Sequence, residues 1–381
     1  MGVLYIVRGG WEAGRRRHIP CYLEAIMAKL DAFFKEMKEQ GASDMHLSVG
    51  SPPMLRLHGT LKKVEYPALT EDVLRSMLYE ILSERQIEKF EKTNDLDFAY
   101  GSPGVARFRA NYYRKHTGLS AAFRIIPFKV LTLDEIGAPE VFKKMCDFNN
   151  GLVLVTGPTG SGKSTTLASM IHYINATSNC HILTLEDPLE FIHEPVKSLI
   201  SQREIGEHTE SFASALKAAL REDPDVILVG EMRDLETISL ALTAAETGTL
   251  VFGTLHTNGA TATVDRIINV FGPLDQPRVR TMLSTSLVGV VSQQLARCAD
   301  GRGRVAAVEV MLNNPAIANL IREGKTAQLY SQIQTGGQLG MMTLERALAN
   351  LVLQGSVSRE EALAKAGKPE ELARLLDDQD S

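Results

Sequence analysis

Residues 157–164 read Gly157-Pro158-Thr159-Gly160-Ser161-Gly162-Lys163-Ser164, and this stretch decides the fold of the chain. It matches the pattern G-x-x-x-x-G-K-[ST] at every position. The apolar run 152–156 comes directly before it, and a helical pattern over residues 164–175 follows. A strand, a glycine-rich loop and a helix in this order aim backbone N–H groups at one point, where an anion is favoured.

Phosphate binding would explain each residue type in this loop. The glycines let the backbone approach phosphate groups, and Lys163 would reach the β- and γ-phosphates. Ser164 would hold magnesium through its hydroxyl, with Thr165 beside it at the start of the helix. A glycine-rich turn that matches by chance is the alternative, but the flanking strand and helix disfavour it. Residues 157–165 therefore predict a site for ATP and Mg²⁺.

Short apolar runs alternate with helical patterns after residue 150. The expected strands are 152–156, 182–185, 226–229 and 250–254, and the expected helices are 164–175, 211–222, 235–246 and 260–270. This alternation predicts an α/β fold, with a parallel-rich sheet that carries helices on both faces. We expect this P-loop domain to span residues 150–314 and a helical C-terminal subdomain to span residues 315–381.

Two glutamates follow apolar runs of the P-loop domain, Glu231 after 226–229 and Glu186 after 182–185. Ligands of parallel sheets sit at the carboxyl ends of the strands. If both strands flank the P-loop strand, both glutamates face the terminal phosphate. Either can then orient or deprotonate the attacking water, and Glu231 is also a candidate magnesium ligand beside Ser164. A helix cap or a surface ion pair is the alternative for each, and the sequence leaves their roles unassigned.

Other polar residues lie at the same predicted edge of the sheet. Gly230 stands where the usual Walker B pattern has an aspartate, and Asp187 and Asp234 are further carboxylates nearby. His256 follows the run 250–254, so a neutral imidazole there would sense the γ-phosphate or join the glutamates in a hydrogen-bonded set. A structural histidine is the alternative.

Residues 27–130 predict a small α+β domain, and residues 131–149 a linker. Strand patterns occur at 45–49, 54–57, 96–100, 106–113 and 119–126, and helical spacing occurs at 28–40 and 71–90, the latter with Thr70 as its N-cap. Arg107 and Arg109 alternate with apolar neighbours, so they share one face of a strand. From the residues alone, a solvated face is favoured over a role with ATP. Residues 1–26 are expected to be an N-terminal extension, with Met27 as the native start.

The composition and charge of the chain make several classes of protein function less favoured. The chain has 381 residues and a net charge of -5, which does not favour non-specific nucleic-acid binding. It contains no apolar run long enough to predict a membrane span. Its four cysteines, at positions 21, 146, 180 and 298, are scattered, so neither a zinc site nor a disulfide framework is expected and a reducing cytoplasm fits best.

Taken together, these motifs resemble the secretion ATPase superfamily, and specifically its twitching-motility branch, the PilT family. The matching segments are 157–164 for Walker A, 184–191 for the Asp box, 221–237 for Walker B and 253–266 for the His box. The early Ser43-Asp44-Met45-His46-Leu47 also resembles the start of the family. The resemblance runs from about Met27 to near the C-terminus.

The resemblance implies a PAS-like first domain, a RecA-like ATPase domain and a ring of six subunits. ATP would lie between the two domains, with Arg107, Arg109 and Arg124 reaching it from a neighbouring subunit. The implied activity is ATP hydrolysis that drives pilin disassembly, and so pilus retraction for twitching motility, through an inner-membrane platform protein. The protein would be cytoplasmic and associated peripherally with the inner membrane at the pilus base.

Two positions depart from the family pattern. Thr249 replaces a first histidine of the His box, and Ala318 replaces the usual arginine in the segment 316–323 that resembles the retraction motif. They favour an alternative: an accessory paralog that binds nucleotide and modulates a partner retraction ATPase. The assembly and secretion ATPases of the superfamily fit less well, because they carry a longer N-terminal region and a four-cysteine zinc element.

Overall fold

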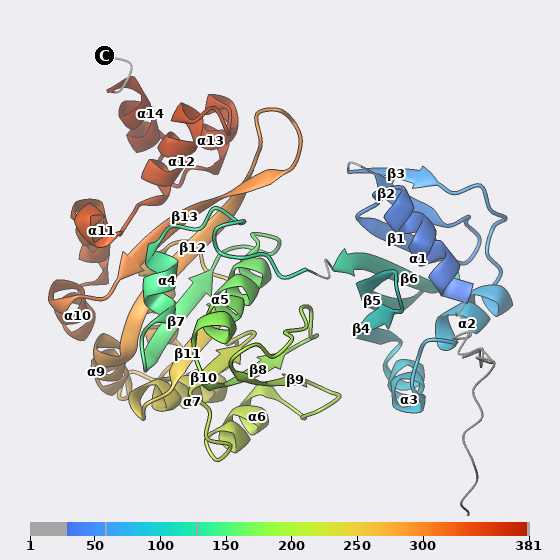
Figure 1. The fold of residues 1–381 in the computed structure, drawn as a ribbon, viewed down its shortest axis with the longest axis horizontal. Coiled ribbons are helices and arrows are strands. Elements are labelled where there is room, and N and C mark those ends of the chain that lie inside the picture. Colours follow the sequence, from blue (N-terminus) through green and yellow to red (C-terminus); the bar gives the residue numbers. More distant parts are fainter. Residues whose placement is uncertain (1–28, 58, 127–128, 379–381) are drawn as a thin grey trace, which may run out of the picture.

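The computed structural model describes residues 29–57, 59–126 and 129–378, and the expected extension at 1–26 lies outside this part. Two lobes make up the described chain: an N-terminal domain and a larger domain that holds the P-loop (Figure 1). No helix within the described residues is both long and apolar enough to cross a membrane.

The N-terminal domain is a six-stranded antiparallel sheet in the order β3-β2-β1-β6-β5-β4. Its strands are β1 (Asp44–Ser48), β2 (Met54–Leu57), β3 (Thr60–Lys63), β4 (Asp95–Ser102), β5 (Ala106–Lys115) and β6 (Gly118–Ile126). Helix α1 (Lys29–Glu39) packs on one face, where the stacked rings of Phe34 and Phe108 lie 4.0 Å apart at the centre of the core. All four residues of β3 are exposed, so no buried alternation marked it in the sequence.

The single helix expected over residues 71–90 is wrong, because two helices form there. They are α2 (Glu71–Tyr79) and α3 (Glu84–Thr93). The Ser83 hydroxyl accepts from the Gln86 N–H at 3.3 Å, and the Gln86 side chain accepts from the Ser83 N–H at 3.0 Å. This reciprocal capping box starts a new helix. The expected cap of α2 is confirmed, since the Thr70 hydroxyl accepts from the N–H of Val73.

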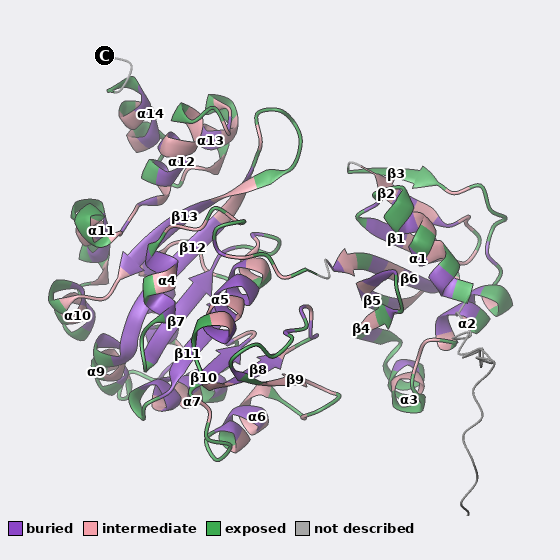
Figure 2. Cartoon of the chain, viewed as in Figure 1, coloured by how far each residue is buried: buried purple, intermediate pink, exposed green. Residues whose placement is uncertain are grey.

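The P-loop domain is built on a seven-stranded sheet in the order β13-β12-β7-β11-β10-β8-β9, parallel except for the β12–β13 pair. Its strands are β7 (Gly151–Thr156), β8 (His181–Glu186), β9 (Leu199–Glu204), β10 (Val226–Val229), β11 (Leu250–Leu255), β12 (Leu287–Arg297) and β13 (Arg304–Leu312). The strands are mostly buried (Figure 2). The expected α/β class with a parallel-rich sheet is confirmed.

Helices cover both faces of this sheet. α4 (Val141–Cys146) and α5 (Lys163–Thr177) pack on one face. The other face carries α6 (Phe212–Ala219), α7 (Leu235–Glu246), α8 (Ala260–Asn269) and α9 (Gln276–Ser286). The sequence analysis did not predict β9, β12, β13, α4 or α9.

The chain after residue 314 is helical, as expected, and its helices contact the sheet in two places. The helices are α10 (Pro315–Arg322), α11 (Leu329–Thr335), α12 (Leu344–Leu353), α13 (Arg359–Lys365) and α14 (Pro369–Asp377). α10 and α11 add to the layer that holds α7, α8 and α9. α12, α13 and α14 pack on the β12–β13 hairpin through Ala296 and Ala307. The hairpin therefore joins the C-terminal helices to the centre of the seven-stranded sheet.

Candidate nucleotide site

The P-loop connects β7 to α5 and turns through three glycines with positive φ. Gly157 has φ 138°, Gly160 has φ 77° and Gly162 has φ 89°. A Cβ atom on Gly157 would overlap the backbone carbonyl oxygen of Gln293 and lie 2.8 Å from the Ser161 hydroxyl. Only glycine fits at this position, since both the φ angle and the space exclude a side chain.

The loop leaves the residues that were predicted to bind phosphate accessible. Pro158, Thr159 and Gly160 are exposed, and so is Ser164 in the first turn of α5. The ammonium group of Lys163 donates to the carbonyl oxygens of Gly157 at 2.9 Å and Pro158 at 3.1 Å. Burial lowers the pKa of Lys163, and the nearby carboxylate of Glu231 opposes that shift. The cation is therefore held directly over the loop.

Glu231 and His256 form a pair at the carboxyl edge of the sheet. The Nε2 atom of His256 lies 3.2 Å from a carboxylate oxygen of Glu231, and the guanidinium of Arg233 contacts the same oxygen. Glu231 is 20% exposed and His256 is 43% exposed. A cavity of about 350 Å³ opens beside Glu231. The structure thus brings together Lys163, Glu231 and His256, which lie far apart in the sequence.

The strand order corrects the assumption that the strands before both glutamates flank the P-loop strand. The neighbours of β7 are β11 and β12. β10, which precedes Glu231, is one strand beyond β11, and β8, which ends in Glu186, is one further still. Of the three strands that precede Glu186, Glu231 and His256, β11 before His256 is the one that lies next to the P-loop strand. Long-range pairing decides this order, and local residue patterns do not report it.

Glu186 lies in a separate, more buried environment. Its carboxylate accepts from the Thr184 hydroxyl at 2.7 Å and the Gln202 amide at 3.5 Å. Burial raises the pKa of Glu186 to about 7, although both hydrogen bonds act in the opposite direction. Desolvation lowers the pKa of Arg107 of the N-terminal domain, and the carboxylates of Glu204 and Glu186 oppose that shift.

The aspartates near these glutamates differ in role. Both carboxylate oxygens of Asp234 cap α7, accepting from the N–H of Thr237 at 2.9 Å and from its hydroxyl at 2.8 Å. These hydrogen bonds lower the pKa of Asp234. Asp234, which the sequence analysis named as a further carboxylate nearby, is therefore the N-cap of α7. Asp187 is exposed, and its pKa is raised by desolvation.

The three arginines share one face of the N-terminal sheet, with Arg109 directly opposite Arg124. Arg107 donates to the Leu189 carbonyl of the same chain at 3.0 and 3.1 Å. Arg109 contacts Asp97 at 2.6 Å and Glu190 at 3.3 Å. Arg124 is 70% exposed and contacts Asp44 at 2.8 Å. Arg107 and Arg109 thus reach the Asp box of their own chain. The purely solvated face that the residues alone favoured is wrong for these two.

Gln293 is a site residue that the sequence analysis missed. It lies in β12, is 1% exposed, and its amide contacts the P-loop backbone. In the sequence, Gln293 is visible only as a polar residue within the strand that follows α9. A buried amide needs a hydrogen-bond partner, but the sequence does not say which residue that partner is.

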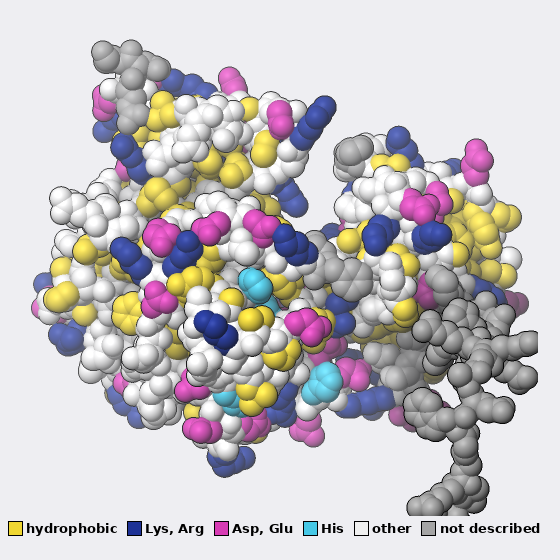
Figure 3. Space-filling model, in the orientation of Figure 1, with side chains coloured by type: hydrophobic (Ala, Val, Ile, Leu, Met, Phe, Trp, Pro, Cys, Tyr) yellow, Lys and Arg dark blue, Asp and Glu magenta, His cyan; other side chains and the backbone are white. Residues whose placement is uncertain are grey.

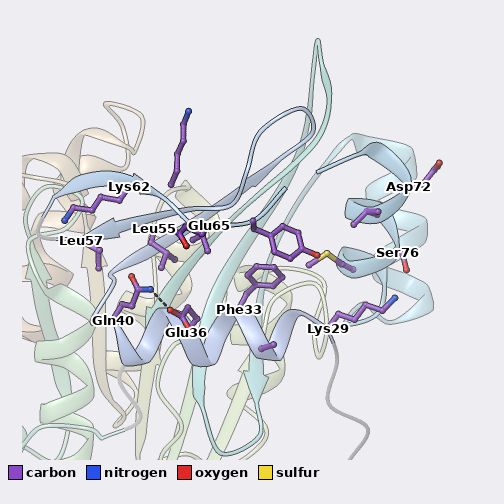
Figure 4. A pocket seen from close by; sticks show the side chains of 16 residues that line it. Lys29, Phe33, Glu36, Gln40, Leu55, Leu57, Lys62, Glu65, Asp72 and Ser76 are labelled. Carbon is purple, nitrogen blue, oxygen red and sulfur yellow. Dashed lines mark hydrogen bonds between the residues drawn. The ribbon is translucent and has the colours of Figure 1, made fainter. Parts of the chain in front are cut away.

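A different hollow, of about 1160 Å³, lies in the N-terminal domain between α1, α2 and β2 (Figure 4). Phe33, Leu55, Tyr66 and Met77 line it, and hydrophobic side chains gather over the segment between β3 and α2 in Figure 3. None of the residues predicted for the nucleotide site lines this hollow, so the size of a hollow does not by itself locate the nucleotide site. On the face shown in Figure 3, positive and negative side chains are interspersed.

Comparison with known proteins identifies the family. The family described as type II/IV secretion system protein matches residues 23–364. The type IV pilus retraction ATPase PilT of Pseudomonas aeruginosa is 56% identical over 332 residues, which cover 87% of this chain and 96% of that relative. The chain belongs to the PilT family.

A second curated relative and a solved structure of the PilT family also match the chain. The type IV pilus ATPase PilU of Pseudomonas aeruginosa is 37% identical over 348 residues, or 91% of each chain. A crystal structure of the pilus retraction motor PilT with bound ADP matches with a TM-score of 0.84 and 48% identity, over 91% of this chain and 99% of that chain. The two-domain α/β architecture described above is therefore the PilT architecture.

Proposed function

We propose that this chain is an ATP-hydrolysing motor that drives type IV pilus retraction for twitching motility. The observation that carries the proposal is the meeting of the P-loop Lys163 with the Glu231–His256 pair in a chain 56% identical to PilT. A cation over the loop and a carboxylate within its field are the groups that phosphoryl transfer to water requires.

Each group has a proposed role. Residues 157–165 bind the phosphates of ATP, with Lys163 neutralising the charge that develops on the terminal phosphate. Glu231 orients the attacking water and takes its proton, while His256 fixes the carboxylate. Ser164 and Glu231 would hold Mg²⁺; the hard oxygen donors and the exposure of Ser164 fit that ion, which would neutralise phosphate charge when bound. Glu186 is assigned a supporting role, because its environment is shared with Arg107.

We further propose a ring of six subunits. Arg124 is the arginine best placed to reach a neighbour's nucleotide, since 70% of its side chain is exposed. Arg107 and Arg109 would contribute after leaving the Asp-box loop of their own chain. The ring would associate peripherally with the cytoplasmic face of the inner membrane and act on a platform protein of the pilus.

An accessory paralog that modulates a partner retraction ATPase is the second candidate. Ala318 and Thr249 favour it. Ala318 lies on α10 without the charge that the family segment usually carries there, and the Thr249 hydroxyl makes only a long contact, 3.5 Å, with the Pro224 carbonyl.

Steady-state ATP hydrolysis by the purified protein, beside Lys163→Ala, separates these candidates when the mass of the oligomer is recorded on the same samples. Turnover in a hexamer that disappears in Lys163→Ala supports the motor. Binding of ATP without turnover contradicts the motor and supports the accessory subunit.

A further inference from the structure

Strand β12 lies directly beside the P-loop strand, and its Gln293 contacts both ends of the loop. The side-chain amide nitrogen donates to the Ser161 carbonyl at 2.6 Å. The amide oxygen accepts from the Thr166 hydroxyl at 2.9 Å. Ser161 belongs to the loop and Thr166 to the first turn of α5, and all three side chains are buried. One amide therefore fixes the loop relative to the helix that it opens.

The glycines of the motif also fit around Gln293. Its backbone carbonyl closes the space beside Gly157, and a Cβ on Gly162 would lie 3.1 Å from its side-chain nitrogen. The loop is thus packed against Gln293 at its beginning, its middle and its end. Such packing selects one loop conformation before any ligand arrives, and a preorganised site loses less conformational entropy on binding.

The opposite face of the same strand holds the His-box helix. Ser292 lies in register with Thr156 of β7 and Glu309 of β13. Ser292 accepts from the N–H of Gly259 at 2.8 Å, and Glu309 accepts from the N–H of Ala260 at 2.7 Å. These N–H groups begin α8, which follows His256 closely in the chain. Strand β12 therefore reaches the P-loop on one face and the His-box segment on the other.

We propose that Gln293 is a positioning residue for the nucleotide, because it sets the shape of the P-loop. This inference rests on the proposed function. Without the amide, the Ser161 carbonyl and the Thr166 hydroxyl would be buried without these partners, a loss that is costly in a dry interior. The loop would relax to recover hydrogen bonds, and its N–H groups would no longer converge on the phosphates.

Hydrogen exchange of the loop amides tests this directly, without requiring catalysis. Gln293→Met keeps the volume and removes the hydrogen bonds. We expect exchange of amides 157–166 to accelerate about tenfold or more, and the affinity for ADP to fall by a similar factor. Gln294→Met is the matched control, since this neighbour points to the other face and is expected to leave both quantities unchanged. Thr166→Val, which removes one of the two contacts, should give a smaller change in the same direction.

Three results would contradict a positioning role for Gln293. Loop exchange in Gln293→Met equal to that of the wild type overturns the inference. So does faster exchange with unchanged ADP affinity, because the loop would then be shaped by Gln293 without consequence for the ligand. A purely structural role would lower the melting temperature and leave KM for ATP unchanged, whereas a positioning role raises KM more than it lowers kcat. Failure of the wild type to bind ADP would refute the proposed function instead. The hydrogen exchange of the loop amides would still test whether Gln293 sets the shape of the loop.

Discussion

Glu186 makes the stability of the ATPase domain depend on pH. Its folded-state pKa is raised from 4.5 to about 7 by burial at the end of β8. The folded protein therefore holds this proton at a pH where the unfolded chain has released it. The contribution of Glu186 to the free energy of unfolding is fully present below about pH 4.5 and is lost as pH rises through about 7. Glu186→Gln resembles the protonated form and should remove this dependence.

The two pKa values fix the size of the effect. A shift from 4.5 to about 7, at about 1.4 kcal/mol per pKa unit, corresponds to about 3 kcal/mol in total. Glu186→Gln should thus match the wild type in acid and exceed it by about 3 kcal/mol at pH 8. At about 2–4 °C per kcal/mol for a unit of 150–250 residues, the difference in melting temperature should grow by roughly 6–12 °C.

Thermal melts of both proteins at pH 5, 6, 7 and 8 measure this difference. Glu246→Gln changes an exposed glutamate at the end of α7 and serves as the control, because its melting temperature should stay parallel to that of the wild type. A constant gap between Glu186→Gln and the wild type across this range would refute the assignment of a raised pKa to Glu186.

Three further changes probe the site. Glu231→Gln should reduce kcat by about 100-fold or more with ATP affinity kept within a few-fold, because an amide takes up no proton; equal turnover would remove Glu231 from the mechanism. Gly157→Ala should abolish ATP binding in calorimetry, since its Cβ meets the Gln293 backbone, whereas Gly272→Ala, at a position without a positive φ and in open space, should bind normally. Arg107→Ala should slow hydrolysis in the assembled ring and not in the monomer; a fully active ring would reject the role in a neighbour's site.

Local patterns were enough for the elements that begin and end with clear signals. The strand before the P-loop, β10 and α7 lie where the apolar runs and helical spacing predicted them. The order of the strands was beyond these patterns, because each pairing joins residues far apart in the chain. The break between α2 and α3 was hidden because apolar residues recur at helical spacing on both sides of Ser83, with Leu82 before it and Ile87 and Phe90 after it.

The residues of the candidate site likewise divide into those that local patterns predict and those that they do not. Lys163 was predictable because the loop motif is contiguous, and His256 because it follows a strand. Gln293 was not, since 132 residues separate it from its partner Ser161. The contacts of Arg107 with the Asp box were likewise invisible, because they depend on how the two domains meet.

The small apolar cluster of Ile126, Ala168 and Phe191 bears on how force is generated. Ile126 ends the N-terminal sheet, Ala168 lies on the P-loop helix, and Phe191 is the last residue of the Asp box. Three side chains of this kind contribute a few kcal/mol, comparable to typical coupling energies between distant sites. A shift of the P-loop helix would therefore disturb a contact with the other lobe whose loss costs only a few kcal/mol, so the two lobes are coupled without being locked together.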